Sequence, residues 1–410
     1  MVRGAVWVQQ LREAGQARFD ALGFPNSKQE AWRFTSVAPI ANTKFELAAH
    51  ASPTGYRVAS EGSLRLVFVN GHFDETLSRV GSLPPGVRVE SLWRAPASDA
   101  QLVQAHLAKH ASYQSEPFAA LNTASLHDGA FVYVPPKVTL AEPIELAFLT
   151  VPGAAPQVAH PRTLIVVERE ARATIVETYD ALSDGVYWTN AVTEVVAGDG
   201  ARVDCYRVQQ EGKRSYHVAT TATHQGRDST VRLHSVAFGG ALARHDVRGT
   251  LAGPGGSLVL NGLYVLAGSQ HTDHHTTIDH AAPHCESHEY FNGVLDDASR
   301  GVFNGKIIVR PGAQKTDSKQ TNNNLLLTDR AHADSQPQLE IYADDVKCTH
   351  GSTVGPLDPK ALFYLESRGI GEDEARRLMT YGFAAEILNR MDIAPLREQL
   401  DRIVRGRLAA

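Results

Sequence analysis

The strongest indication of the fold lies in the runs SLVLNGLYVL (257–266), HTTID (275–279), VFNGKIIV (302–309) and QLEIYA (338–343). In QLEIYA, Leu339 and Ile341 fall on one face while Glu340 and Tyr342 fall on the other, which is the two-residue period of a half-buried strand. Similar short runs recur from about residue 121 to 355, and each is stopped by Gly, Asn, Asp or Pro. Helical periodicity over ten or more residues is missing from this block.

Many short strands in one block indicate a sandwich, a barrel or a β-solenoid. The block has about 230 residues, which is long for a single sandwich, whereas a solenoid grows by adding turns and has no such limit. The sequence therefore favours a mainly β fold with a β-helix core, although no strict repeat can be read from it.

Helical patterns flank this block on both sides. Trp7, Leu11 and Phe19 belong to an apolar series spaced mostly by three and four residues, which predicts a first helix ending near Gly23. Ser27 and Glu30 predict a capping box at the start of a second, short one. We expect an N-terminal helical and mixed region over residues 1–120, which also contains a strand-like run (64–71) and a helical patch (101–110).

The last fifty residues predict three more helices. Asp358 and Pro359 are a typical cap and first turn, with Gly369 just past the end of the helix. A longer helix is expected from Glu372 to Asn389 and a third from Pro395 to Arg405. The domains predicted from the sequence are therefore 1–120, the β-helix core at 121–356, and a C-terminal helical domain at 357–410.

Composition limits the classes of function. The chain has 410 residues, 43% hydrophobic and 21% charged, with a net charge of -5. This mildly acidic balance argues against nucleic acid as a partner, because phosphate binding needs a concentrated basic surface. No stretch resembles a membrane span or a signal peptide, so we expect a cytoplasmic protein.

Three cysteines, Cys205, Cys285 and Cys348, are too few and too widely spaced for a disulfide framework, which agrees with a reducing compartment. A self-contained iron–sulfur cluster usually takes four thiolates, so any cluster that this chain binds must borrow ligands from another protein.

Two glycine-rich stretches imitate nucleotide-binding motifs. The stretch GVFNGK (301–306) is one residue short of a P-loop, and Ile307 replaces the hydroxyl that would hold Mg²⁺. GPGG (253–256) lacks the third glycine of a dinucleotide fingerprint. We expect a turn at each, and we predict no catalytic residues.

A cluster of histidines between residues 271 and 288 is a candidate metal site, since imidazole is a common metal ligand. Its members are His271, His274, His275, His280, His284, His288 and the neighbouring Cys285. Adjacent residues of a strand face opposite ways, however, which favours polar histidines on a strand surface over a converging site. The sequence leaves both interpretations open.

The segment 287–383 carries an ordered series of specific motifs: GVFNGK (301–306), GAQKT (312–316), QTNNNLL (320–326), PQLEI (337–341), DDVKCTHG (344–351) and FYLESRGI (363–370). Further motifs lie upstream: DHHTTIDH (273–280), LNTA (121–124), VNG (69–71), WRFT (32–35) and LGFP (22–25). Together they resemble the SufB/SufD family, the scaffold proteins of the SUF iron–sulfur cluster assembly machinery, over nearly the whole chain.

Within that family the chain is similar to the SufD-like members. SufB-like chains carry a cysteine after the glutamine of the QTNNNLL region, where this chain has Thr321 after Gln320. SufD-like chains carry the motif that reads KCTHG (347–351) here.

The resemblance implies a right-handed parallel β-helix with flanking helices and a non-catalytic role. The implied partners are a SufB-like subunit, paired as a heterodimer, and a SufC-like ABC ATPase, bound through the C-terminal helices. A transient iron–sulfur cluster would form at the subunit interface. Reduced flavin is associated with complexes of this type, although no flavin motif is visible in this sequence.

Cys348 and His350 are the candidate metal ligands. They are two residues apart, so in a strand both side chains project from one face, about 6.5–7 Å apart. A thiolate and an imidazole both bind iron well. Cys348 could instead pack in the core as a small apolar residue. The family resemblance implies a ligand role for His350 first and Cys348 second, completed by a cysteine of the SufB-like partner.

Two other functions stay open on the sequence alone. A β-helix can carry a carbohydrate-active site in a groove lined with acidic and basic residues. A self-sufficient scaffold could form a homodimer and bind the ATPase without a SufB-like subunit.

Overall fold

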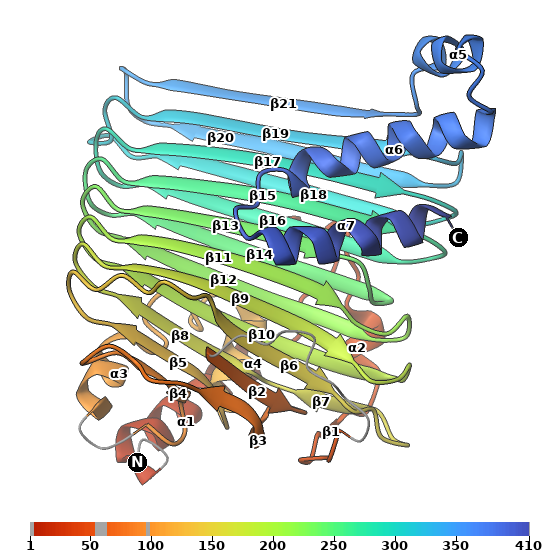
Figure 1. The fold of residues 1–410 in the computed structure, drawn as a ribbon. Helices are drawn as coiled ribbons and strands as arrows, with labels where there is room; N and C mark the ends of the chain where they lie inside the picture. Colours follow the sequence, from red (N-terminus) through yellow and green to blue (C-terminus); the bar gives the residue numbers. More distant parts are fainter. Residues whose placement is uncertain (1–3, 54–63, 96–98, 410) are drawn as a thin grey trace.

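The computed structural model describes residues 4–53, 64–95 and 99–409 of the chain. Strands are the most frequent element in this part, with helices at both ends (Figure 1). The mainly β fold expected from the sequence is confirmed.

The body of the molecule is a parallel β-solenoid in which each turn contributes one strand to each of two sheets. Sheet A contains, in spatial order, β20 (His332–Ile341), β18 (Arg300–Val309), β16 (His271–His280), β14 (Leu242–Leu251), β12 (Tyr216–Gln225), β10 (Tyr187–Ala197), β8 (Arg162–Val167), β5 (Gly129–Val134) and β4 (Arg88–Ser91). Sheet B contains β21 (Lys347–Gly355), β19 (Asp317–Leu326), β17 (Glu286–Leu295), β15 (Ser257–Leu266), β13 (Thr230–Ala237), β11 (Arg202–Gln210), β9 (Arg172–Ala181), β6 (Ile144–Thr150), β2 (Leu64–Val69) and β3 (His72–Val80).

The register of neighbouring strands defines the repeat. Ser287 pairs with Ser318 and Ser318 with Cys348, so one turn takes about 30 residues. Every second residue of a strand points into the space between the sheets, and in-register residues of successive turns form columns there. The β-solenoid that the sequence favoured over a sandwich or a barrel is thus confirmed.

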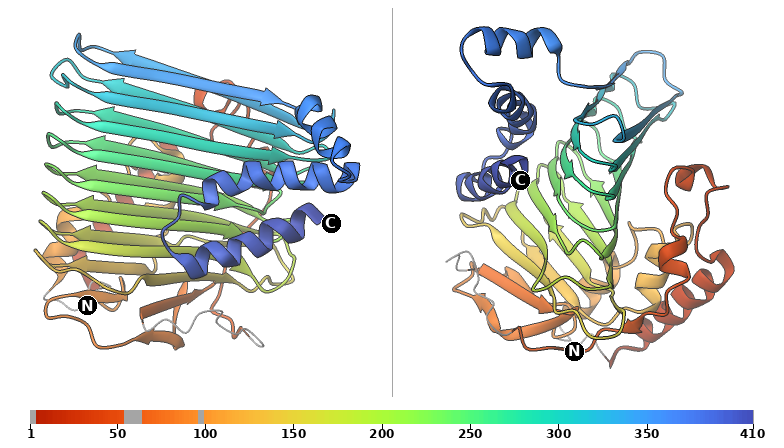
Figure 2. Two further views of the ribbon diagram at one scale, coloured as in Figure 1. Left: turned by 45° about the horizontal axis from the view of Figure 1, so that its top comes forward. Right: turned by 90° about the vertical axis from the view of Figure 1, so that its right-hand side faces the viewer.

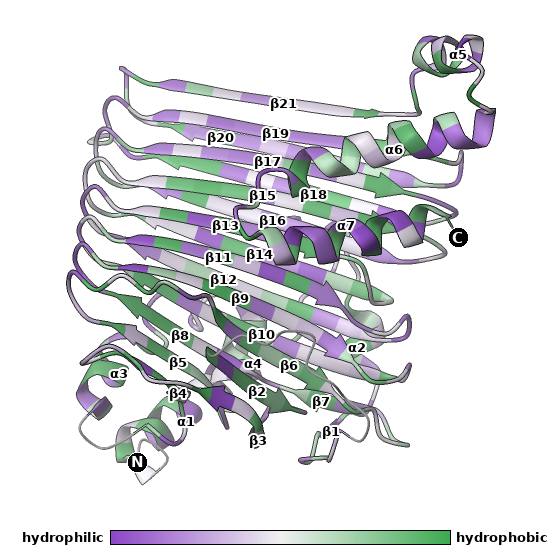
Figure 3. Cartoon of the chain, in the orientation of Figure 1, coloured by the Kyte–Doolittle hydropathy of each residue, from purple (hydrophilic) through white to green (hydrophobic). Residues whose placement is uncertain are grey.

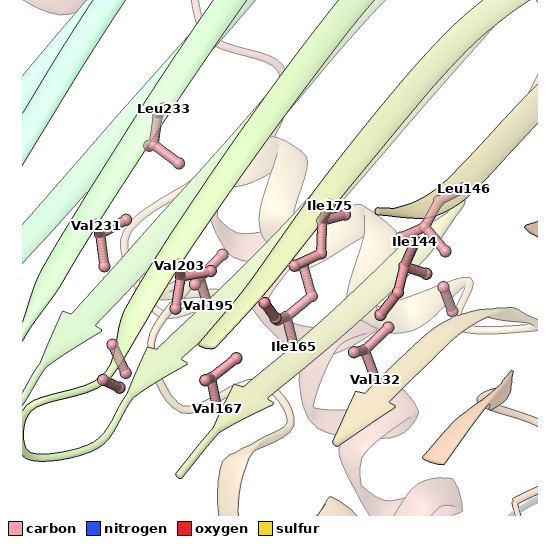
Figure 4. Close-up of a cluster of buried hydrophobic side chains, with 14 of the residues drawn as sticks. Val132, Ile144, Leu146, Ile165, Val167, Ile175, Val195, Val203, Val231 and Leu233 are labelled. Atoms are coloured by element: carbon pink, nitrogen blue, oxygen red, sulfur yellow. The ribbon is translucent and has the colours of Figure 1, made fainter. Parts of the chain in front are cut away.

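The interior near the N-terminal end of the solenoid is apolar. Val132 and Ile165 of sheet A belong to the same buried cluster as Ile144, Ile175 and Val203 of sheet B (Figure 4). Burying each such side chain contributes about 1.5–3 kcal/mol to folding. Toward the C-terminal end the composition changes: Figure 3 shows mostly hydrophilic colours on β19 and β20, where β6 and β8 are mostly hydrophobic.

The C-terminal helices are α5 (Pro359–Ser367), α6 (Glu372–Leu388) and α7 (Ala394–Ala409). As expected, the Asp358 side chain accepts a hydrogen bond from the Lys360 N–H at the start of α5, and Gly369 follows its end with a φ of 86°. Helices α6 and α7 lie against the outer face of sheet B (Figure 2). Leu263 and Val294 of the sheet pack there in one buried cluster with Leu400.

The N-terminal region covers the outer face of sheet A. It comprises α1 (Val6–Leu22), the 3-10 helix η2 (Glu30–Trp32), α2 (Ala38–Ala41), α3 (Ala100–His106), α4 (Pro117–Ala124) and the short strand β1 (Glu46–Leu47), which pairs with β7 (Gln157–Ala159). The first helix, the strand at 64–71 and the helical patch at 101–110 are confirmed.

The capping box expected at Ser27 and Glu30 is wrong. That segment forms only η2, whose N-cap is Gln29 and makes no side-chain capping bond. Tertiary packing holds this segment instead, since Trp32 lies in a buried aromatic cluster and packs 5.3 Å from Phe118 between ring centroids.

A buried ion pair ties the segment between α3 and α4 to sheet A. Arg162 Nη2 lies 2.6 Å from Glu194 Oε2, and both side chains are inaccessible to solvent. Glu194 also accepts hydrogen bonds from the backbone N–H groups of Ala108, His110 and Ala111. Burial alone would raise the pKa of Glu194, but the Arg162 guanidinium and these N–H groups lower it overall.

Among the helices of the described segments, none is long and apolar enough to cross a membrane.

Candidate functional site

The candidate ligands lie on β21, the last strand of the solenoid. Among the described strands, β21 pairs only with β19, and β20 only with β18, so both sheets end in a free edge. The last turn is open: Ile341 of β20 and Val354 of β21 are 40% and 47% exposed. A free edge presents unpaired N–H and C=O groups that can pair with a strand of another chain.

Cys348 and His350 stand in register with two buried residues of β19. Cys348 pairs with Ser318, and His350 pairs with Gln320. Because Ser318 and Gln320 point into the solenoid, the candidate ligands point to the same inner side, at its open end. The shared strand face expected from the sequence is therefore present.

The two candidate ligands differ in their surroundings. Cys348 is half-buried and packs against the apolar cluster of Ile307, Val309 and Ala313. Burial, together with the nearby Asp317 carboxylate, raises the pKa of the Cys348 thiol. His350 is exposed at the open edge. Nowhere in the described ranges do three or more His, Cys, Asp or Glu residues come together as a metal-binding group. A metal bound by Cys348 and His350 would therefore need ligands from a partner.

The structure does not bring the histidine cluster together. His271 and His275 lie on the outer face of sheet A, whereas His274 and His280 point into the solenoid. His284 lies in a turn with a φ of 61°, and His288 lies on the outer face of sheet B. The expectation of surface histidines is wrong for His274 and His280, which are 1% and 0% exposed.

Three of these histidines have partners that link neighbouring elements. His271 Nε2 lies 2.9 Å from Thr35 Oγ1, and His280 Nε2 lies 2.8 Å from Ser287 Oγ. The His274 ring stacks on Tyr264 with 5.1 Å between ring centroids. Cys285 is fully buried in the apolar core. These contacts tie strands and the N-terminal region together.

The WRFT motif (32–35) and the DHHTTIDH motif (273–280) are far apart in the chain but meet on sheet A. Thr35 of the first donates a hydrogen bond to Asp273 Oδ2 of the second. Arg244 Nη1 donates to the same oxygen at 2.6 Å, and its guanidinium lies 3.7 Å above the Trp32 ring. The N-terminal segment is thus anchored to the solenoid by a buried charge network.

The stretch GVFNGK lies inside β18 rather than in a phosphate-binding loop. Lys306 forms an ion pair with Glu340 of β20. A Cβ atom on Gly305 would collide with the amide of Gln320, which crosses the interior at that point. This glycine makes room for a buried side chain, so the motif is part of the strand, not the turn that we expected.

Comparison with known proteins places this arrangement in a family. Residues 149–383 match the family model described as "SUF system FeS cluster assembly, SufBD core domain", and residues 3–146 match the "SufBD protein N-terminal region". The chain belongs to the SufBD family. Its two matches cover the solenoid and the N-terminal region, and the resemblance inferred from the sequence motifs is confirmed.

Several curated SufBD proteins are similar over most of their length. An iron–sulfur cluster assembly SufBD family protein of Synechocystis is 34% identical, over 96% of this chain and 89% of the relative. The iron–sulfur cluster assembly protein SufD of Escherichia coli is 31% identical, over 92% and 88%. SufD of Bacillus subtilis is 30% identical, over 78% and 73%. A role in SUF iron–sulfur cluster assembly follows from this membership.

One buried acid near the open end was not visible in the sequence. Glu289 of β17 is 2% exposed and faces the interior, where its Oε1 accepts a hydrogen bond from Gln320 Nε2 at 3.0 Å. Its Oε2 has no partner among the residues that the structure describes. Burial raises the pKa of Glu289 from 4.5 to about 7, against the opposing effect of the hydrogen bond from Gln320.

Glu289→Gln is expected to stabilise the fold at pH 8 and much less at pH 5. The folded protein keeps the Glu289 proton up to about pH 7, whereas the unfolded chain releases it near 4.5. Unfolding therefore releases a proton between these values, and stability falls as pH rises through this window. Above pH 7 the buried, ionised Glu289 carboxylate lowers the free energy of unfolding by about 3 kcal/mol, a loss that the neutral glutamine avoids. Urea unfolding of the wild type and the variant at pH 5 and pH 8 measures the difference in their free energies of unfolding. An equal difference at both pH values would contradict the raised pKa of Glu289.

Proposed function

We propose that this chain is a SufD-like, non-catalytic scaffold subunit that pairs with a SufB-like subunit and carries a nascent iron–sulfur cluster at their interface. The observation that carries this proposal is the position of Cys348 and His350. In a member of a cluster-assembly family, a thiol and an imidazole lie two residues apart on one face of a strand with a free edge.

The open end of the solenoid suits a partner with a matching end. Its two free edges offer backbone hydrogen bonds, and exposed Ile341 and Val354 offer apolar surface. A SufB-like solenoid docked there would bury both, and it would supply the thiolates that this chain lacks. Iron and sulfide are then cargo, held by ligands from both subunits.

The C-terminal helices supply a second docking surface, which we assign to a SufC-like ABC ATPase. Helix α5, all of which the structure describes, has no buried residue. Phe363 and Tyr364 on α5 are 71% and 57% exposed, and Leu378 of the adjoining α6 is also exposed. Large exposed aromatic side chains are typical anchors of protein interfaces. ATP hydrolysis would belong to this partner.

Co-expression with the SufB-like and SufC-like proteins of the same organism tests the proposal. We expect one complex that contains all three chains and hydrolyses ATP, whereas this chain purified alone should neither hydrolyse ATP nor hold stoichiometric iron and sulfide. Stoichiometric iron and sulfide in the chain alone would contradict the shared-ligand site.

A homodimer that binds the ATPase and a cluster without a SufB-like chain would instead favour the self-sufficient scaffold. Activity on a polysaccharide would favour the carbohydrate enzyme, which family membership makes the weaker alternative.

A further inference from the structure

A cavity lies between the C-terminal helices and sheet B. Helices α6 and α7 are antiparallel, so the start of α6 and the end of α7 lie at the same side of the molecule (Figures 1 and 2). The cavity is at this side, next to the ends of β15 and β17, and its volume is about 790 Å³. Small-molecule sites typically have volumes of about 300–1,000 Å³ and often lie where two structural units meet. Neither Cys348 nor His350 lines this cavity.

Part of the cavity wall is apolar. Val265 of β15 and Val294 of β17 belong to the buried cluster between sheet B and the helices. Leu327 and Leu408, which also line the cavity, pack against this cluster. Because apolar surface is more stable out of water, this wall favours a ligand with an apolar body.

Two half-buried arginines line the same cavity, Arg376 of α6 and Arg407 of α7. Arg376 Nη2 donates to the Leu327 carbonyl oxygen at 3.4 Å, and the Arg407 guanidinium lies 5.0 Å from the centre of the Phe238 ring. Within the part of the chain that the structure describes, no carboxylate lies within 4.0 Å of either guanidinium. Burial lowers the pKa of Arg407, and no acidic group opposes this effect.

Other buried arginines of this chain do face a carboxylate. Arg162 pairs with Glu194 and Arg244 pairs with Asp273, each at 2.6 Å. A charge removed from water destabilises the fold unless an opposite charge faces it. An anion bound in the cavity would give Arg376 and Arg407 a partner of the same kind.

The acidic residues of the cavity do not neutralise these two arginines. Asp296 and Asp297 lie in a turn after β17 and accept hydrogen bonds from backbone N–H groups. Asp373 is exposed in the first turn of α6. Two exposed cations, Lys213 and Arg377, also line the cavity, so its four basic residues outnumber its three acidic ones.

We propose that this cavity binds a small amphipathic anion, whose carboxylate or phosphate group is held by Arg376 and Arg407 and whose apolar body lies against the apolar wall. Guanidinium groups bind both kinds of oxyanion through charge-assisted hydrogen bonds, often in pairs. The two head groups therefore share one chemistry, and the test separates them. This inference does not depend on the proposed cluster site.

The first test is isothermal titration calorimetry of the full-length chain with octyl phosphate and with octanoate, which carry the same chain on different head groups. We expect saturable binding at one site per chain, and the tighter of the two identifies the preferred head group. Octanol and inorganic phosphate each lack one half of the ligand and should bind at least about 10-fold more weakly. No saturable binding of either amphiphile, or equal binding of octanol or of inorganic phosphate, would overturn the inference.

The second test removes the two charges. Arg376→Met and Arg407→Met keep an apolar stem, so packing against Phe238 is retained, and each should weaken binding of the preferred amphiphile about 10-fold. Arg405→Met is the matched control: it removes a cation from the same helix, but Arg405 is exposed, pairs with Asp401 and does not line the cavity. Thermal unfolding checks each fold. Wild-type affinity in the double variant would overturn the inference.

A photoreactive octanoate locates the site in the wild-type chain without any substitution. We expect crosslinks within 265–270, 376–380 or 407–408, and crosslinks confined to other segments would overturn the inference. Competition with the SufC-like ATPase tests the other class of occupant. Octyl phosphate should stay bound when the ATPase is added. Its displacement would show that the cavity belongs to the docking surface of that partner and would overturn the small-molecule site.

Discussion

The double variant Phe363→Ser/Tyr364→Ser is expected to lose binding to the SufC-like ATPase by about 100-fold or more, while its own fold stays intact. Both side chains are on α5 and point largely into solvent. Truncating one interface anchor typically costs about 2 kcal/mol or more, and each 1.4 kcal/mol is a factor of ten in affinity. Tyr364 is already held in place by Arg368, which lies 5.3 Å from its ring centre and donates to its hydroxyl.

Point variants of α5 are a sharper test than removing residues from 371 onward. Helices α6 and α7 cover the apolar outer face of sheet B, where Phe238, Leu263 and Val294 are buried beneath them. Deleting these helices would expose that face and confound loss of binding with aggregation. Helix α5 contributes no residue to the buried cluster, so substitutions on it leave the solenoid untouched.

Isothermal titration calorimetry with the SufC-like ATPase measures its affinity for the wild type and for each variant. Thermal unfolding of each variant checks that its fold is intact. Val6→Ser is the matched control, since Val6 is 73% exposed but lies on α1, at the other end of the chain. Wild-type affinity in the double variant would remove α5 from the docking surface.

The strand-rich body could be predicted from the sequence, because alternation within a single strand is a local pattern. The arrangement of two sheets with a turn of about 30 residues could not. Residues in register on successive turns point the same way but need not be of the same type. One such column contains Leu258, Ser287, Ser318 and Cys348, so no single residue type marks the repeat in the sequence.

Local signals failed where tertiary contacts decide the conformation. Ser27 and Glu30 form a capping pattern, yet Trp32 packs in an aromatic cluster and the chain makes only a 3-10 turn. The histidines at 271–288 do not converge, as strand alternation predicted, but the same local pattern did not predict that His274 and His280 lie buried inside the solenoid. The caps at Asp358 and Gly369 were predictable because such contacts span only a few residues.

The candidate ligands were found through a family motif, whereas the buried polar residues of the preceding turns were not. Glu289 lies in a strand that reads ESHEYFNGVL, where nothing marks it as buried. Its relation to Gln320 and His350 depends on register across three turns, which local periodicity does not encode. The structure was needed to show that these residues form one column.

His350→Ala is expected to reduce cluster formation by the assembled complex to less than about a tenth of the wild-type level. The imidazole is exposed at the edge of β21, so its removal takes away a ligand but little buried area. The subunits should therefore still assemble. Cys348→Ser should have a comparable or smaller effect. Thr349→Ala, between the two ligands but on the outer face of the strand, should behave as wild type.

The central claim is tested most directly by iron and acid-labile sulfide per complex after anaerobic reconstitution, with gel filtration to confirm that the subunits remain together. An intact His350→Ala complex with little iron and sulfide, beside a Thr349→Ala complex with normal amounts, is the result expected of a shared cluster site at the open end of the solenoid. A His350→Ala complex that carries wild-type iron and sulfide would contradict it.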